Sequence, residues 1–194
     1  MKLVLASSSP RRKELLAKIS PEFKTAAPPE EAEEPISGGG ASAAPEEFAK
    51  RNALLKAMAV ARTEDGDSII IGADTIVVSE GRIMGKPAGA EEAARMLRAL
   101  SGKTHEVITG IAVTNNATGR TISSFERTEV EFKELSDREI DEYVASGEPI
   151  GKAGAYAIQG LASRFIPGIR GCFFNVVGLP VFRLNSMIME VSES

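Results

Sequence analysis

Residues 3–16 read Leu3-Val4-Leu5-Ala6-Ser7-Ser8-Ser9-Pro10-Arg11-Arg12-Lys13-Glu14-Leu15-Leu16, an apolar run, a serine-rich turn and a charged, helix-forming segment. This order predicts a strand, a turn and a helix. Ser9 suits the N-cap and Pro10 the first helical position, so the hydroxyls and free amide donors of the turn converge on one point. Arg11 and Arg12 then lie in the first helical turn, where a cation is unfavourable without a negative partner. The turn therefore indicates a phosphate site, unless both arginines only face solvent.

The rest of the chain alternates predicted helices with predicted strands. A continuous apolar run over 69–78 is typical of a buried central strand, and 105–114 with 121–132 form a long hairpin. Helices are expected over 46–63, 91–100, 136–145 and 180–191, the third opened by a Ser136–Glu139 capping box. Residues 164–169 and 173–177 read as further strands. These elements predict an α/β fold with a mixed, twisted sheet.

Segment 20–45 interrupts this pattern with five prolines and a glycine triplet, Pro21, Pro28, Pro29, Pro35, Pro45 and Gly38-Gly39-Gly40. We expect a mobile loop there. A surface linker and a lid over a cleft fit its length and composition equally well.

Composition excludes several classes of protein. The 194 residues, 43% of them hydrophobic, suffice for one domain, or for two small lobes around a shared cleft. A net charge of -4 argues against the basic face that a sequence-independent nucleic-acid protein needs. Cys172 is the only cysteine, so an intrachain disulfide is impossible. With no long apolar segment, we expect a cytoplasmic protein that contacts neither membrane nor nucleic acid.

Asp74 interrupts the apolar run of the predicted central strand. A carboxylate there is unfavourable to bury unless it is paired, hydrogen-bonded or open to a cleft. Beside a phosphate site it could bind Mg²⁺ or accept a proton, because one or two carboxylates with substrate phosphates and waters hold this ion. The alternative is a structural ion pair with a lysine.

Two lysines add to the two arginines. Lys86 projects from the turn Gly85-Lys86-Pro87, and Lys56 lies on a helix of small residues. Each alone reads as a solvated surface charge, but four cations brought together by the fold would match a triphosphate. We expect His105 to organise a turn and Cys172 to be a buried or half-buried thiol.

Four ordered motifs resemble the Maf family of nucleoside triphosphate pyrophosphatases from end to end. They are Leu5-Ala6-Ser7-Ser8-Ser9-Pro10-Arg11-Arg12; Gly72-Ala73-Asp74-Thr75-Ile76-Val77 with Gly85-Lys86-Pro87; Ser101-Gly102-Lys103-Thr104-His105; and Gly154-Ala155-Tyr156-Ala157-Ile158-Gln159-Gly160 with Val177-Gly178-Leu179-Pro180. The resemblance implies a single domain over 1–194, with two lobes around a central cleft, related to inosine triphosphate pyrophosphatase (Ham1) and often dimeric. It also implies hydrolysis between the α and β phosphates with a divalent cation, Mg²⁺ or Mn²⁺.

The resemblance also implies a role for particular residues. Asp74 takes the acid/base and metal-site role. Phosphate contacts fall to Ser7, Arg12, Lys56 and Lys86, and substrate choice to Arg11, Thr75 and Gln159. Where the family usually has Asp-Glu, this chain has Glu33-Glu34, which leaves their part in metal binding open.

Gln159 favours the dTTP/UTP branch of the family, because a neutral amide can both donate to and accept from a pyrimidine edge. A branch acting on 7-methyl-GTP carries an acidic residue in this region, and that activity is one alternative. The other, suggested by the family's historical name, is a nucleotide-binding regulator of septum formation.

Overall fold

The computed structural model describes residues 2–36, 44–64 and 66–193. Its strands are β1 (Lys2–Ala6), β2 (Lys24–Thr25), β3 (Ser68–Ser79), β4 (Arg82–Met84), β5 (Thr104–Asn115), β6 (Thr121–Glu131) and β7 (Gly168–Arg170). Its α-helices are α1 (Pro10–Leu16), α2 (Pro45–Ala61), α3 (Ala90–Leu100), α4 (Asp137–Ala145), α5 (Phe173–Val177) and α6 (Val181–Ser192). Three short 3-10 helices are η1 (Glu30–Ala32), η2 (Ala153–Ala155) and η3 (Leu161–Phe165).

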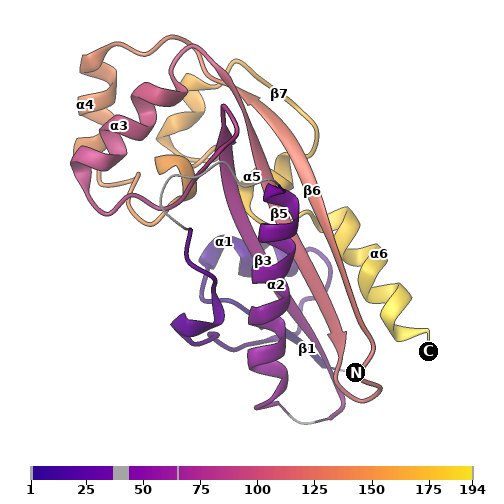
Figure 1. The fold of residues 1–194 in the computed structure, drawn as a ribbon. Coiled ribbons are helices and arrows are strands. Elements are labelled where there is room, and N and C mark those ends of the chain that lie inside the picture. The colour runs from indigo at the N-terminus through magenta and orange to yellow at the C-terminus, as the bar shows by residue number, and fades with distance from the viewer. Residues whose placement is uncertain (1, 37–43, 65, 194) are drawn as a thin grey trace.

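The strands of the described residues form one seven-stranded sheet in the order β2-β1-β3-β5-β6-β7, with β4 beside β3 (Figure 1). The β2–β1 and β1–β3 pairs are parallel, whereas the β3–β4, β3–β5, β5–β6 and β6–β7 pairs are antiparallel. The sheet is therefore mixed, as the sequence predicted. Figure 1 shows α3 and α4 at one end of the long strands, with α1 and α2 lower along them.

β3 is the central strand, and its two faces pack against different helices. Ile70 lies in a cluster with the alanines of α2, whereas Ile69 and Ile71 lie in the larger core that includes α1, α3, α4 and α6. Because side chains alternate along a strand, Gly72 and Asp74 share the face covered by α2. The backbone of α2 comes so close that a Cβ on Gly72 would lie 2.1 Å from the carbonyl oxygen of Ala53.

β3 also has an incompletely paired edge. β1 pairs with β3 only as far as Ala6, which lies opposite Gly72, and β4 begins to pair at Val77. Within the described residues, the intervening stretch of β3 has a strand on the β5 side alone. The turn after β1 is thereby placed beside Asp74 and Thr75.

Most predicted elements are confirmed, including the hairpin, the capping box at Ser136 and the helix after Pro180. The strand predicted over 173–177 is wrong, because these residues form α5. A five-residue segment with four apolar residues and Asn175 at its centre is too short for its periodicity to separate a strand from a helix. The strand predicted over 164–169 is mostly wrong as well: η3 continues to the buried Phe165, and β7 begins only at Gly168.

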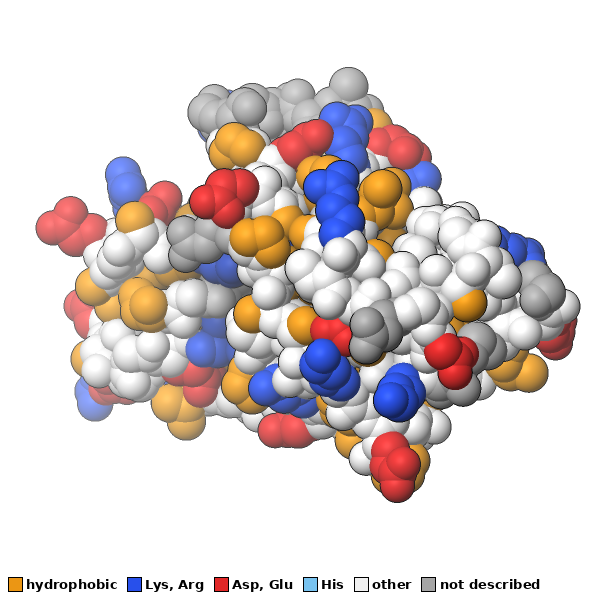
Figure 2. All heavy atoms as spheres, turned by 90° about the horizontal axis from the view of Figure 1, so that it is seen from below, with side chains coloured by type: hydrophobic (Ala, Val, Ile, Leu, Met, Phe, Trp, Pro, Cys, Tyr) orange, Lys and Arg blue, Asp and Glu red, His pale blue; other side chains and the backbone are white. Residues whose placement is uncertain are grey.

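The surface carries charges of both signs. Figure 2 shows acidic and basic side chains interspersed over the face seen from below, with separate hydrophobic side chains among them. Among the described residues, no helix has the length and apolar character that crossing a membrane requires. The assignment of 1–194 to one domain with two lobes stays a prediction.

Candidate functional site

A pocket of about 490 Å³ lies at the incompletely paired edge of β3. The volume is within the range of small-molecule sites. Its walls come from the turn after β1, the start of α1, β3, α2, the β4–α3 turn and the segments 151–159 and 176–178. The pocket includes all eight residues that the sequence analysis selected: Ser7, Arg11, Arg12, Lys56, Asp74, Thr75, Lys86 and Gln159.

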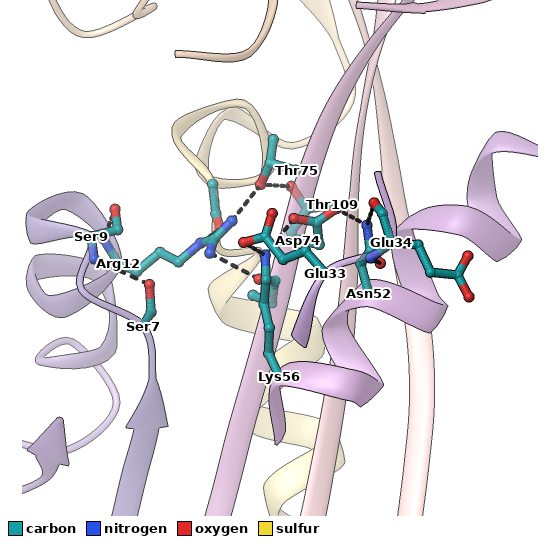
Figure 3. Close-up of polar contacts among 12 residues, drawn as sticks. Ser7, Ser9, Arg12, Glu33, Glu34, Asn52, Lys56, Asp74, Thr75 and Thr109 are labelled. Atoms are coloured by element: carbon teal, nitrogen blue, oxygen red, sulfur yellow. Dashed lines mark hydrogen bonds and ion pairs between the residues drawn. The ribbon is translucent and has the colours of Figure 1, made fainter. Parts of the chain in front are cut away.

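Asp74 and Lys56 form a buried ion pair on one wall (Figure 3). Lys56 Nζ lies 2.6 Å from Asp74 Oδ1 and 2.8 Å from Glu33 Oε1, and Asn52 Nδ2 donates to Asp74 Oδ2 at 3.4 Å. Lys56 is only 4% exposed and lines the pocket, so of the two readings of this lysine the solvated surface charge is wrong. Asn52 and Lys56 are one helical turn apart, and the close approach of α2 to β3 brings both to the carboxylate. Lys56 thus neutralises the buried carboxylate of Asp74, and both residues line the pocket.

Arg12 crosses from α1 to the incompletely paired edge of β3. Its guanidinium donates to the carbonyl of Ala73 at 2.8 Å, to Thr75 Oγ1 at 3.0 Å and to the carbonyl of Gly178 at 2.9 Å. Three of the five N–H donors are therefore used within the protein. Burial lowers the pKa of Arg12 from its usual value, and the Asp74 carboxylate opposes this shift. Arg12 thus fixes the pocket wall, and a phosphate contact would use its remaining donors.

Thr75 links Arg12 to the neighbouring strand β5. Its hydroxyl lies 2.9 Å from that of Thr109 on β5, which donates to the carbonyl of Asn175 at 3.1 Å. The role in substrate choice that the resemblance implied for Thr75 stays a prediction. Its contacts indicate that it also helps to orient Arg12.

The turn after β1 has the predicted geometry. Ser9 is the N-cap of α1 and its hydroxyl accepts from the amide of Arg12, while the buried Ser7 hydroxyl accepts from the amide of Ser9 at 3.1 Å. These bonds orient Ser7 within the turn. Its predicted phosphate contact stays a prediction.

Arg11, Lys86 and Gln159 line the pocket from three different segments, and the side chains of Lys86 and Gln159 are exposed. A ligand can therefore reach both. The structure also places Lys152 on the wall, a cation that the sequence analysis missed. Burial and the nearby charge of Arg11 lower its pKa. The proximity of Lys152 to the motif 154–160 was the signal available in the sequence.

The balance of charge in the pocket is opposite to that of the chain. Arg11, Arg12, Lys56, Lys86 and Lys152 are five cations, whereas Glu33 and Asp74 are the two carboxylates. A pocket with three surplus positive charges in a protein of net charge -4 attracts a small polyanion rather than a nucleic-acid surface.

Segment 20–45 contains β2 and η1, so it is not wholly irregular. Pro28, Pro29 and Glu33 line the pocket, which places this segment at the site, as a lid would be. The glycine triplet lies outside the described residues, and closure of a lid stays a prediction. Glu34 contributes differently, because its backbone amide donates to Asn52 Oδ1 at 2.8 Å and its carboxylate pairs with Arg51.

His105 and Cys172 do not line the pocket. His105 is 2% exposed, and its Nε2 lies 2.8 Å from the hydroxyl of Tyr156. The expectation of a turn-organising histidine is therefore wrong, because the ring lies in the aromatic core beside Phe132. Burial lowers its pKa to about 4. Cys172 is half-buried, as predicted, at the start of α5.

Comparisons with known proteins agree with this geometry. The sequence model of Maf-like proteins matches residues 2–191. Proteins of Bacillus cereus (strain B4264) and Bacillus anthracis, both named dTTP/UTP pyrophosphatase, are 51% identical over 183 residues, which are 94% of this chain and 92% of theirs. A Ham1 protein structure from Coxiella burnetii covers 98% of this chain and 99% of its own at 16% identity and a TM-score of 0.51, a likeness of fold. The match over nearly the whole chain and the 51% identity together establish that this chain belongs to the Maf-like protein family.

Proposed function

We propose that this chain hydrolyses dTTP and UTP to the nucleoside monophosphate and pyrophosphate. The observation that carries the proposal is the pocket itself, where four further cations line the walls together with the buried Lys56–Asp74 pair. Relatives at 51% identity that are named dTTP/UTP pyrophosphatase support the choice of substrate.

The phosphate chain would lie against the cations of the pocket. Arg11, Lys86 and Lys152 come from separate segments, so together they can contact several phosphate groups. Fixed positive charges stabilise the negative charge that develops on the phosphates, and they need no rearrangement during the reaction. The pocket walls therefore both bind the substrate and lower the barrier.

Asp74 is the residue that would orient the attacking water or accept its proton. Lys56 and Asn52 hold its two carboxylate oxygens, so the side chain has a fixed direction toward the pocket. A positioned base near the α-phosphorus is what hydrolysis between the α and β phosphates requires. Asp74→Asn would keep the shape of this side chain and remove its basicity.

The residues on this wall fit a divalent cation. Asp74 and Glu33 offer carboxylate oxygens, the donors that Mg²⁺ and Mn²⁺ prefer. Since no group of three or more His, Cys, Asp or Glu suited to a metal occurs among the described residues, substrate phosphates and waters would complete the coordination. Bound there, the cation would neutralise phosphate charge and polarise the scissile bond.

Gln159 would read the base. Its exposed amide lies at the pocket, where it can donate to a pyrimidine carbonyl and accept from the ring N–H. Gln159→Glu would replace this pair by a carboxylate, which suits a cationic base such as 7-methylguanine. This substitution should therefore shift the preference away from dTTP.

We also propose a homodimer. Phe173 and Phe174 of α5 and Phe182 and Met189 of α6 are exposed apolar side chains, and Phe182 is 86% exposed. Beside Phe182 and Met189, the Arg183–Glu126 and Arg120–Glu190 pairs supply charges of both signs, which a second copy related by a two-fold axis can match. Phe182→Glu should shift the mass measured by light scattering from dimer to monomer. A parent that is already monomeric would contradict the dimer.

The substrate class supports a cytoplasmic location.

A panel of nucleotides tests the proposed activity. Pyrophosphate release is measured from dTTP, UTP, CTP, 7-methyl-GTP, ITP and the common dNTPs, with Mg²⁺ and with chelator. Metal-dependent release concentrated on dTTP and UTP is expected, and Asp74→Asn should abolish it. The matched control is Asp67→Asn, an exposed aspartate just before the same strand. Release that survives in Asp74→Asn would remove Asp74 from the mechanism.

A further inference from the structure

Both flanks of Gln159 are tied to one pair of side chains at the end of α4. The amide of Ala157, two residues before Gln159, donates to Tyr143 Oη at 3.3 Å. The amide of Leu161, two residues after it, donates to Glu148 Oε2 at 3.0 Å. Tyr143 Oη in turn donates to Glu148 Oε1 at 2.9 Å, so the two anchors are connected.

This pair is itself held firmly. Tyr143 is fully buried, and its ring meets that of Phe165 edge-on at 5.4 Å between centroids. Burial and the Glu148 carboxylate raise the pKa of Tyr143, so its hydroxyl stays a donor. Lys152 Nζ donates to the backbone carbonyl of Glu148, and Ser146 Oγ accepts from its amide at 3.2 Å. The carboxylate is therefore presented in one place.

Gly160 shows how closely the loop lies on this pair. A Cβ on Gly160 would lie 2.3 Å from Glu148 Oε1 and 2.5 Å from Oε2. Its φ is -101°, a value that any residue adopts, so a larger residue here would meet the carboxylate and not an unfavourable backbone conformation. An alanine at this position would displace the carboxylate from Leu161.

We propose that Tyr143 and Glu148 are positioning residues. They hold loop 157–161, and with it the side chain of Gln159, in the position from which it contacts the nucleotide base. The inference rests on the proposed function, because it takes Gln159 as the group that reads the base. Neither residue is among those that line the pocket, so they act through the loop. Arg11 and Lys86, which line the pocket for the phosphates, lie on other segments and keep their places when the loop loosens. Lys152 donates to the backbone carbonyl of Glu148, a contact that Glu148→Ala leaves in place.

The test compares Glu148→Ala, Gly160→Ala and the parent. We expect KM for dTTP to rise about tenfold, the size of effect that one charged hydrogen bond has, while kcat changes less than threefold. The preference for dTTP over 7-methyl-GTP should fall by a similar factor. Tyr143→Phe, which removes one oxygen, should lie between the parent and Glu148→Ala. Glu142→Ala is the matched control, because Glu142 lies on the exposed side of α4 and pairs only with Arg138 in the contacts described.

A second measurement tests, independently of activity, the brace that Tyr143 and Glu148 form on loop 157–161. Hydrogen exchange of the Ala157 and Leu161 amides should quicken at least tenfold in Glu148→Ala and remain unchanged in Glu142→Ala. Unchanged exchange would overturn the brace, whatever the activity. Faster exchange with unaltered nucleotide preference would overturn the link to Gln159. If the parent releases no pyrophosphate, the proposed function fails, and binding of dTTP against 7-methyl-GTP then decides whether the brace sets preference.

Discussion

Gly72→Ala tests whether the close approach of α2 to β3 builds the Lys56–Asp74 pair. In an extended strand this change ordinarily stabilises a protein by about 0.4–1 kcal/mol, because alanine restricts the unfolded chain. Here the new Cβ would lie 2.1 Å from the carbonyl oxygen of Ala53 and 2.9 Å from the amide of Ala57. Both are backbone atoms of α2, so the whole helix has to move.

The size of the effect follows from these distances. Normal contact requires about 3.5 Å, so the 2.1 Å approach has to lengthen by about 1.4 Å, which α2 can supply only by shifting. Overpacking of this kind destabilises by about 1–3 kcal/mol, which lowers Tm by about 2–12 °C for a chain of this length. Lys56 and Asn52 move with the helix, and a 1 Å misplacement can lower turnover about 100-fold.

Thermal unfolding and pyrophosphate release check both parts. Gly66→Ala is the matched control, because a Cβ there meets nothing within 4 Å. We expect the control to match the parent in Tm and rate. A Gly72→Ala protein that is as stable as the parent and retains its turnover within twofold would refute the argument that α2 packing sets the geometry of the pair.

Three further predictions concern the buried polar groups. Lys56→Met leaves the carboxylates of Asp74 and Glu33 without their shared cation. The free energy of unfolding, measured with urea, should therefore fall by about 3–5 kcal/mol, and a fall below 1 kcal/mol would contradict the pairing. Arg12→Lys keeps the charge but cannot reach three acceptors at once, so we expect Tm and turnover both to fall; parental values would show that the charge alone suffices. His105 remains neutral in the folded protein down to a pKa of about 4, whereas the unfolded chain binds a proton below 6.5. Stability should therefore fall as pH drops from 6.5 to 4, by about 3 kcal/mol, and His105→Gln should remove that part of the acid dependence; an unchanged pH profile would contradict it.

Local signals predicted the elements that carry the site. The strand, turn and helix around Ser9 follow from capping and the position of Pro10, and the buried strand around Asp74 follows from its apolar neighbours. Phe173–Val177 was predicted as a strand because five residues, four of them apolar, are too few to show a clear period. Gly171 and Gly178, both with positive φ, bracket the short helix that forms instead.

Long-range packing determined the rest. Lys56 read as a surface lysine, because nothing near it in the sequence shows that Gly72 lets α2 approach the sheet. His105 read as a turn residue, because its partner Tyr156 is 51 residues away. Lys152 was missed for the same reason, since its place in the pocket depends on the path of the chain after α4.

The most direct test of the proposed activity is the identity of its products. Phosphorus NMR of dTTP incubated with the protein and Mg²⁺ distinguishes the two ways in which the phosphate chain can be cleaved. The proposed function predicts dTMP and pyrophosphate in equal amounts, and neither in Asp74→Asn. Formation of dTDP and phosphate would contradict the assigned cleavage, and dTTP that binds but stays intact would favour a nucleotide-binding regulator instead.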